Sequence, residues 1–148
     1  MNTISKTNNY TATVDVPVTA DQAQKAVSQV SKWWAINFHG AAENKGDKFS
    51  IAFGDTFVNF QVSELIHGQK TVWYVTDCYL HWLDDKTEWK DTQVEWLFQD
   101  KGGDTTITMT HIGITPEVEC YDSCRKGWNE YVLTSLPAFI KTGKGQPS

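Results

Sequence analysis

The chain has 148 residues, a usual length for one domain, and 13% of them are aromatic. Its net charge of −5 argues against a nucleic-acid backbone or an anionic membrane as the main partner. No apolar run approaches the about 18 residues of a membrane span, and Met1–Asn9 lack the apolar core of a signal peptide. We therefore expect one cytoplasmic domain over residues 1–148, with flexible ends at 1–8 and 144–148.

The N-terminal third has the pattern of a strand followed by two short helices. Tyr10–Val16 alternates and is rich in Thr and Val, which is typical of a strand, and Pro17 ends it. Thr19–Gln22 has the spacing of a capping box, which predicts a helix that runs to about Gln29. Ser31–Trp34 then predicts a second, shorter helix or turn.

From Ile36 onward the period of the apolar residues changes to two, which indicates strands. Short turn signals separate these segments and favour antiparallel pairing, with the Gly102-Gly103 hairpin the clearest. The alternation places each apolar set on one face of a sheet. The segments lie at Phe49–Phe53, Val58–Val62, Val72–Tyr79, Val94–Phe98 and Ile107–His111.

The stretch Thr115–Gly143 predicts one long C-terminal helix. Thr115 can cap its start, and Gly143 can end it in the left-handed conformation. Pro137 lies inside the stretch and predicts a bend near Leu133–Leu136. The apolar face needs cover of similar size, which only the sheet can supply. That face is formed by Tyr121, Cys124, Trp128, Tyr131, Val132, Ser135, Leu136 and Phe139.

Three cysteines are present, an odd count that argues against a disulfide framework in a chain without a secretory signal. Cys120 and Cys124 lie four residues apart and, with His111, could imitate a metal site. Their spacing matches no usual zinc pattern, and buried cysteine commonly acts as a small apolar side chain. We therefore expect apolar cysteines, no metal and no cofactor.

The order strand, two helices, meander of strands and long final helix resembles the START-like (SRPBCC) superfamily, and within it the branch of homologues of the activator of heat-shock protein 90 ATPase. This resemblance implies an α+β helix-grip (Bet v 1-like) fold. A curved antiparallel sheet of about six or seven strands would surround the C-terminal helix. The stretches that carry the resemblance are Val14–Val18 leading to Trp33-Trp34, Thr92–Phe98, Gly103–His111, and Gly127-Trp128 followed by Lys141–Gly145.

The aromatic excess on both facing surfaces suggests that a small, mainly apolar molecule, lipid-like or aromatic, binds between helix and sheet. The alternative for each single ring is that it simply fills the core. His111 is the best titratable candidate, although such a residue is more often satisfied by its neighbours. The residues expected to line the cavity are Trp34, Phe60, Tyr74, Trp96, Phe98, Met109, His111, Cys124, Trp128 and Tyr131.

Two other functions stay open at this stage. The superfamily includes cyclases, dehydratases and hydrolases, but the sequence holds none of the usual catalytic motifs, so no catalytic residue is assigned. The branch name suggests a chaperone-associated, partner-binding domain. Activators of that kind look like two-domain proteins, and this chain has room only for the C-terminal type of domain. A homodimer is compatible with the sequence but not derivable from it. The connection Leu80–Asp91 is either a lid at the pocket mouth or a solvated loop.

Overall fold

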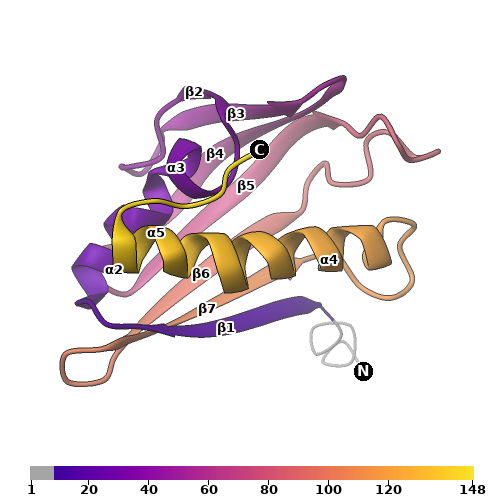
Figure 1. Cartoon of the computed structure of the whole chain (residues 1–148). Helices are drawn as coiled ribbons and strands as arrows, with labels where there is room; N and C mark the ends of the chain where they lie inside the picture. Colours follow the sequence, from indigo (N-terminus) through magenta and orange to yellow (C-terminus); the bar gives the residue numbers. More distant parts are fainter. Residues whose placement is uncertain (1–8) are drawn as a thin grey trace, which may run out of the picture.

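The computed structural model describes residues 9–148 and shows a curved antiparallel sheet that wraps around a C-terminal helix (Figure 1). The strand order is β1-β7-β6-β5-β4-β3-β2, so β1 and β2 form the edges. The sequence prediction of a helix-grip sheet is confirmed, whereas the prediction for residues 1–8 lies outside the described residues. The strands are β1 (Tyr10–Val16), β2 (Asn37–Gly40), β3 (Lys48–Phe53), β4 (Thr56–Ile66), β5 (Lys70–Tyr79), β6 (Gln93–Asp100) and β7 (Thr105–Ile112).

Two short helices follow β1, as predicted: α2 (Ala20–Ser28) and α3 (Val30–Trp33). The capping box of α2 is present in both directions. Gln22 N donates to Thr19 Oγ1 at 3.2 Å, and Thr19 N donates to Gln22 Oε1 at 3.0 Å. These bonds satisfy two backbone N–H groups that would otherwise lack partners at the helix start.

The C-terminal helix is continuous in three parts: α4 (Tyr121–Glu130), a π-helical turn η1 (Tyr131–Ser135) and α5 (Leu136–Thr142). At Leu133–Leu136, where the sequence predicts a bend, the helix passes through this wider turn, in which Leu136 N donates to Tyr131 O, five residues back. Pro137 follows at once and has no N–H to donate. The helix ends as predicted at Gly143, with φ of +83°. Across residues 9–148, no helix combines the length and apolar character that a membrane crossing requires.

The predicted helix start at Thr115 is wrong, because α4 begins only at Tyr121. The preceding residues form turns, with Val118 N bonded to Thr115 O at 3.0 Å. Glu88, from the β5–β6 connection, accepts the N–H groups of Glu119 and Cys120, both at 2.9 Å. A carboxylate distant in the sequence therefore satisfies the backbone at the helix start, where a local cap was predicted.

Indole rings fill the centre of the space between helix and sheet. Trp33, Trp73 and Trp96 are each fully buried, with ring centroids 5.7 Å apart for Trp33 and Trp96 and 5.2 Å apart for Trp73 and Trp96. The expected cavity beneath the helix is therefore reduced at its centre. Open space remains at the ends of this core.

The last residues of the chain return to α3 and bond to it. Ser148 N donates to Trp34 O at 3.0 Å, and Ile36 N donates to Ser148 O at 2.9 Å. The buried Ser135 hydroxyl donates to the carbonyl of Trp33 and accepts from Gln146 N. These bonds hold a tail that the sequence predicts to be loose.

Candidate functional site: an aromatic cleft

An apolar cleft lies where α4, the β5–β6 connection (residues 80–92) and the β3–β4 hairpin meet. It consists of two neighbouring cavities of about 280 Å³ and about 120 Å³. Both are lined by the same five aromatic residues, which define what we call the aromatic cleft: Trp34, Phe53, Trp82, Trp89 and Tyr131. Within residues 9–148, no charged side chain lines either cavity. The larger also touches Ile51, Thr56, Val58 and Leu80, and the smaller also touches Ser123, Cys124, Gly127 and Trp128.

Four separate segments of the chain supply these rings. Strand alternation puts Phe53 on the inner face of β3, and the end of α3 supplies Trp34. The C-terminal helix brings Trp128 against Trp34, with ring centroids 4.8 Å apart, and Tyr131 near Phe53, at 6.3 Å. The β5–β6 connection closes the cleft with its two tryptophans. Of these, Trp82 is 50% exposed and stands at the mouth.

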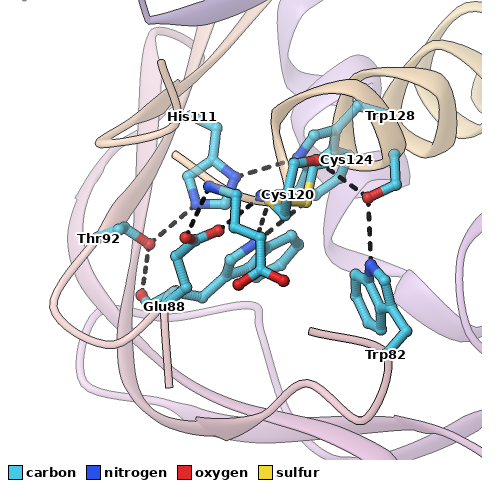
Figure 2. Close-up of a disulfide and its surroundings, with 10 residues drawn as sticks. Trp82, Glu88, Thr92, His111, Cys120, Cys124 and Trp128 are labelled. Carbon is cyan, nitrogen blue, oxygen red and sulfur yellow. Dashed lines mark hydrogen bonds between the residues drawn. A yellow bond between two sulfur atoms is a disulfide. The ribbon is translucent and has the colours of Figure 1, made fainter. Parts of the chain in front are cut away.

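Two carboxylates bind the β5–β6 connection to the start of α4. Glu119 accepts the backbone N–H groups of Asp84 and Asp85, at 2.8 and 3.0 Å, and Glu88 accepts those of Glu119 and Cys120. The bonds from Asp84 and Asp85 lower the pKa of Glu119. Figure 2 shows Glu88 beside the start of the helix. The connection is therefore a hydrogen-bonded wall of the cleft in this structure.

Cys120 and Cys124 form a disulfide across the first turn of α4, with their Cα atoms 5.5 Å apart (Figure 2). This corrects the expectation of two unpaired apolar cysteines. Trp89 Nε1 lies 3.4 Å from Cys120 Sγ and 3.3 Å from Cys124 Sγ, and donates to both. The four-residue spacing on a helix was the available signal, but spacing alone also suits two separate thiols. Cys78 is free and buried, and its burial raises the pKa of the thiol.

His111 is fully buried, and both of its ring nitrogens are occupied (Figure 2). Trp128 Nε1 donates to His111 Nδ1 at 3.1 Å, which assigns the proton of the neutral ring to Nε2. That N–H donates to Thr92 Oγ1 at 2.9 Å, and Thr92 donates to the carbonyl of Trp89 at 2.6 Å. Burial lowers the pKa of His111 to about 3, so the ring stays neutral. The geometry gives His111 a structural role and leaves no nitrogen for acid–base work or a metal.

The structure brings four of the ten predicted site residues to the cleft: Trp34, Cys124, Trp128 and Tyr131. Five others are buried in the core beside it: Phe60, Trp96, Phe98, Met109 and His111. Tyr74 lies on the opposite face of the sheet, because its neighbour Trp73 takes the inner position on β5.

Sequence reasoning missed three of the aromatic cleft residues: Phe53, Trp82 and Trp89. The two tryptophans belong to the connection that it described as either a lid or a solvated loop. Alternation does not apply to a loop, so nothing local indicated which way those rings point.

A larger groove, of about 590 Å³, lies between α2, the β2–β3 loop and the end of β4. Its lining carries charges of both signs, from Asp21, Lys25 and Glu43, beside the apolar side chains of Val27, Leu65 and Trp73. Gln24 at its edge is satisfied, since its amide bonds to Ile66, Gly68, Lys70 and Thr71. We prefer the aromatic cleft as the candidate site, because more aromatic side chains converge there and no charge has to be desolvated. Among residues 9–148, no three metal-ligating side chains gather to hold an ion.

An antiparallel sheet that grips a C-terminal helix is the helix-grip fold, and here it leaves an apolar cleft at one end. Residues 26–141 match the family model of the Activator of Hsp90 ATPase homolog 1-like protein, and the chain belongs to this family. No curated protein matches the sequence.

Several solved structures share the fold. The solution structure of the Aha1 dimer from Colwellia psychrerythraea is 18% identical, with a TM-score of 0.75, and the match covers 93% of this chain and 98% of that one. DynU16, from the dynemicin biosynthetic locus, is 19% identical with a TM-score of 0.67, over 93% of this chain and 49% of that one. CalU16 from Micromonospora echinospora is 13% identical with a TM-score of 0.64, over 92% and 75%. At these identities the likeness establishes the fold alone.

Proposed function

We propose that the aromatic cleft binds a small, mainly apolar molecule of aromatic or lipid-like character. The observation that carries the proposal is the convergence of five aromatic side chains, from separate parts of the chain, on two cavities. Neither cavity has a charged lining residue from the described part of the chain. Apolar concave sites with a few placed polar groups are typical of small-molecule binding.

The volume limits the size of the ligand. The larger cavity, about 280 Å³, lies just below the about 300–1,000 Å³ that small-molecule sites usually span. A compact molecule with two or three aromatic rings, or a short acyl chain, fits this space better than a large polycyclic ligand.

Among residues 9–148, one hydroxyl that lines the cleft, that of Thr56, is free to donate to such a ligand, since the O–H of Tyr131 donates to Ser148 Oγ. Thr56 lines the larger cavity, and its Oγ1 accepts the backbone N–H of His81 at 3.0 Å, its one hydrogen bond within residues 9–148. Its own O–H can therefore donate to the ligand. Ser123 is committed already, because it accepts from Trp82 Nε1 and donates to the carbonyl of Cys120. We infer a ligand that is apolar over most of its surface and carries one hydrogen-bond acceptor.

The test is titration with N-phenyl-1-naphthylamine, a neutral fluorescent probe in which an amine joins a naphthyl group and a phenyl group. Its fluorescence should rise with wild-type protein, and Trp82→Ala at the cleft mouth should weaken binding by about tenfold, the equivalent of about 1.4 kcal/mol. Leu97→Ala is the matched control, since Leu97 is also exposed but lies on β6 outside both cavities. No enhancement with wild type, or equal losses in the two variants, would reject the cleft as the site.

The two other functions gain less support from the geometry. An enzyme that uses His111 would need a free ring nitrogen, and both have partners. A chaperone partner would need an outward apolar surface, for which the chain offers the stacked pair Phe57 and Tyr79, 38% and 39% exposed. That pair is small beside the apolar patches that mark protein interfaces.

A further inference from the structure

We propose that the Cys120–Cys124 disulfide is a redox-active pair that exchanges with a dithiol reductant through the aromatic cleft. The proposal uses the cleft as the route of approach and does not depend on whether the cleft also binds an apolar ligand. Its basis is the unequal placement of the two sulfurs and their contact with a side chain of the cleft wall.

The two cysteines differ in their access to the cleft. Cys124 lines the smaller cavity and is 6% exposed, whereas Cys120 is fully buried and lines neither cavity. An incoming thiolate therefore reaches Sγ of Cys124 and not Sγ of Cys120. Cys78 is a buried free thiol on β5, held by hydrogen bonds with the backbone of Lys86, Trp89 and Lys90, and the proposed exchange does not use it.

The local chemistry suits departure of Cys120. The thiolate of the reductant bonds to Cys124 Sγ, the S–S bond breaks, and its electron pair leaves on Cys120 Sγ. Trp89 Nε1, 3.4 Å from that sulfur, donates to the new thiolate, and the position at the N-terminus of α4 also favours negative charge. The carboxylate of Glu88, bonded to Cys120 N, opposes it.

The second thiol of the reductant then completes the exchange. It attacks the mixed disulfide at the reductant's sulfur and releases Cys124, and the two protein sulfurs end as thiols with the two protons from the dithiol. The dithiol is oxidised to its own disulfide.

The disulfide contributes little to the stability of the fold. It joins residues only four apart, and the stabilisation from closing a loop grows with loop length. The same turn is already closed by the bond from Cys124 N to Cys120 O, at 2.7 Å. The side chain that depends on the disulfide is Trp89, which donates to both sulfurs and lines both cavities. Reduction should therefore alter the cleft wall and leave the sheet unchanged.

The first test compares two single variants in a Cys78→Ala background. Cys120→Ser leaves the Cys124 thiol, and Cys124→Ser leaves the Cys120 thiol. With 4,4′-dithiodipyridine, a neutral thiol reagent, Cys124 should react at least about tenfold faster than Cys120 because it faces the cleft. Equal rates, or faster reaction of Cys120, would overturn the proposal.

A second measurement uses the wild-type chain, so its result does not depend on whether a variant folds. Protein treated with the mild oxidant diamide should carry one free thiol, at Cys78, and dithiothreitol should restore three. During partial reduction, trapping with iodoacetamide and peptide mapping should find the mixed disulfide with the reductant on Cys124. Three thiols after diamide, or a mixed disulfide on Cys120, would contradict the inference.

A third arm separates this inference from the proposed function. Saturating N-phenyl-1-naphthylamine should slow the reaction of Cys124 in the Cys120→Ser variant. If the probe does not bind at all, the proposed ligand function fails while the comparison of the two thiols still decides the redox proposal. Probe binding without any difference between the thiols gives the reverse result.

Discussion

The indole N–H of Trp128 donates to Nδ1 of the buried His111 at 3.1 Å and so joins the C-terminal helix to β7. From His111 the chain of hydrogen bonds continues through Thr92 to the carbonyl of Trp89 in the β5–β6 connection. One neutral imidazole thus ties together the helix, the sheet and the wall of the cleft. Buried networks in which every member has a partner favour one arrangement of the surrounding side chains.

We expect Trp128→Phe to lower the free energy of unfolding by about 1–3 kcal/mol, because it leaves the buried Nδ1 of His111 without a donor. Urea unfolding measures the loss. Trp82→Phe is the control, since it also deletes an indole N–H, but from a ring that is half exposed at the cleft mouth. Similar losses in both variants would show that the bond to His111 has no special weight.

Stability should fall below neutral pH because of His111. Burial lowers the pKa of the folded residue to about 3, whereas the unfolded residue titrates near 6.5. The unfolded state therefore binds more protons between these values, so the contribution is complete above about pH 6.5 and is lost as the pH falls toward 3. Each pH unit in this window should cost up to about 1.4 kcal/mol per proton.

Urea midpoints between pH 7.5 and pH 5 would measure this effect above the range where most carboxylates titrate. His111→Gln offers the comparison, because glutamine can accept and donate but does not titrate. Its midpoint should change less with pH over the same range. A slope as steep as that of wild type would assign the pH dependence to other groups.

The external cap of α4 gives a third prediction. Glu88→Gln leaves one acceptor for the two backbone N–H groups of Glu119 and Cys120, so it should cost about 1–2 kcal/mol. Amide hydrogen exchange at the start of α4 should quicken as well. Glu117→Gln, an exposed change in the same turn segment, should do neither. Unchanged exchange in Glu88→Gln would mean that the start of the helix does not depend on the connection.

Ser135 gives a fourth prediction, which concerns the anchoring of the C-terminal tail. Its buried hydroxyl bonds to the carbonyl of Trp33 at 2.6 Å and to Gln146 N at 2.7 Å, so Ser135→Ala removes both bonds and should cost about 1–3 kcal/mol. Proteolysis should then remove the C-terminal tail sooner than in wild type. The control is Thr134→Ala in the same π-helical turn, where the side chain is exposed. A tail equally resistant in both variants would argue against the anchoring role.

The regular elements could be predicted because their signals are local. The capping box at Thr19, the alternation from Phe49 to His111 and the left-handed end at Gly143 each depend on neighbouring residues, and the structure confirms them. It was harder to predict which side chains of β5 face the helix, because apolar residues occupy both of its faces. The choice of Trp73 as the inner ring depends on the neighbouring strands. Tyr74 was placed on the wrong face for that reason.

Much of the cleft was decided by contacts between distant segments. Glu88 caps a helix about thirty residues away, which is why α4 begins later than the residues from Thr115 onward suggest. Trp82 and Trp89 stand on a connection whose path is set by the carboxylates of Glu88 and Glu119, and not by periodicity.

By itself the sequence determined the succession of strands and helices and the aromatic faces that had to meet, since burial of apolar surface and backbone periodicity act over a few residues at a time. Only the tertiary structure decided that indoles fill the centre, that the remaining cleft opens beside the β5–β6 connection, and that two sulfurs join beneath Trp89. Those outcomes depend on how volumes and hydrogen bonds from remote segments fit together, which no single stretch of residues specifies.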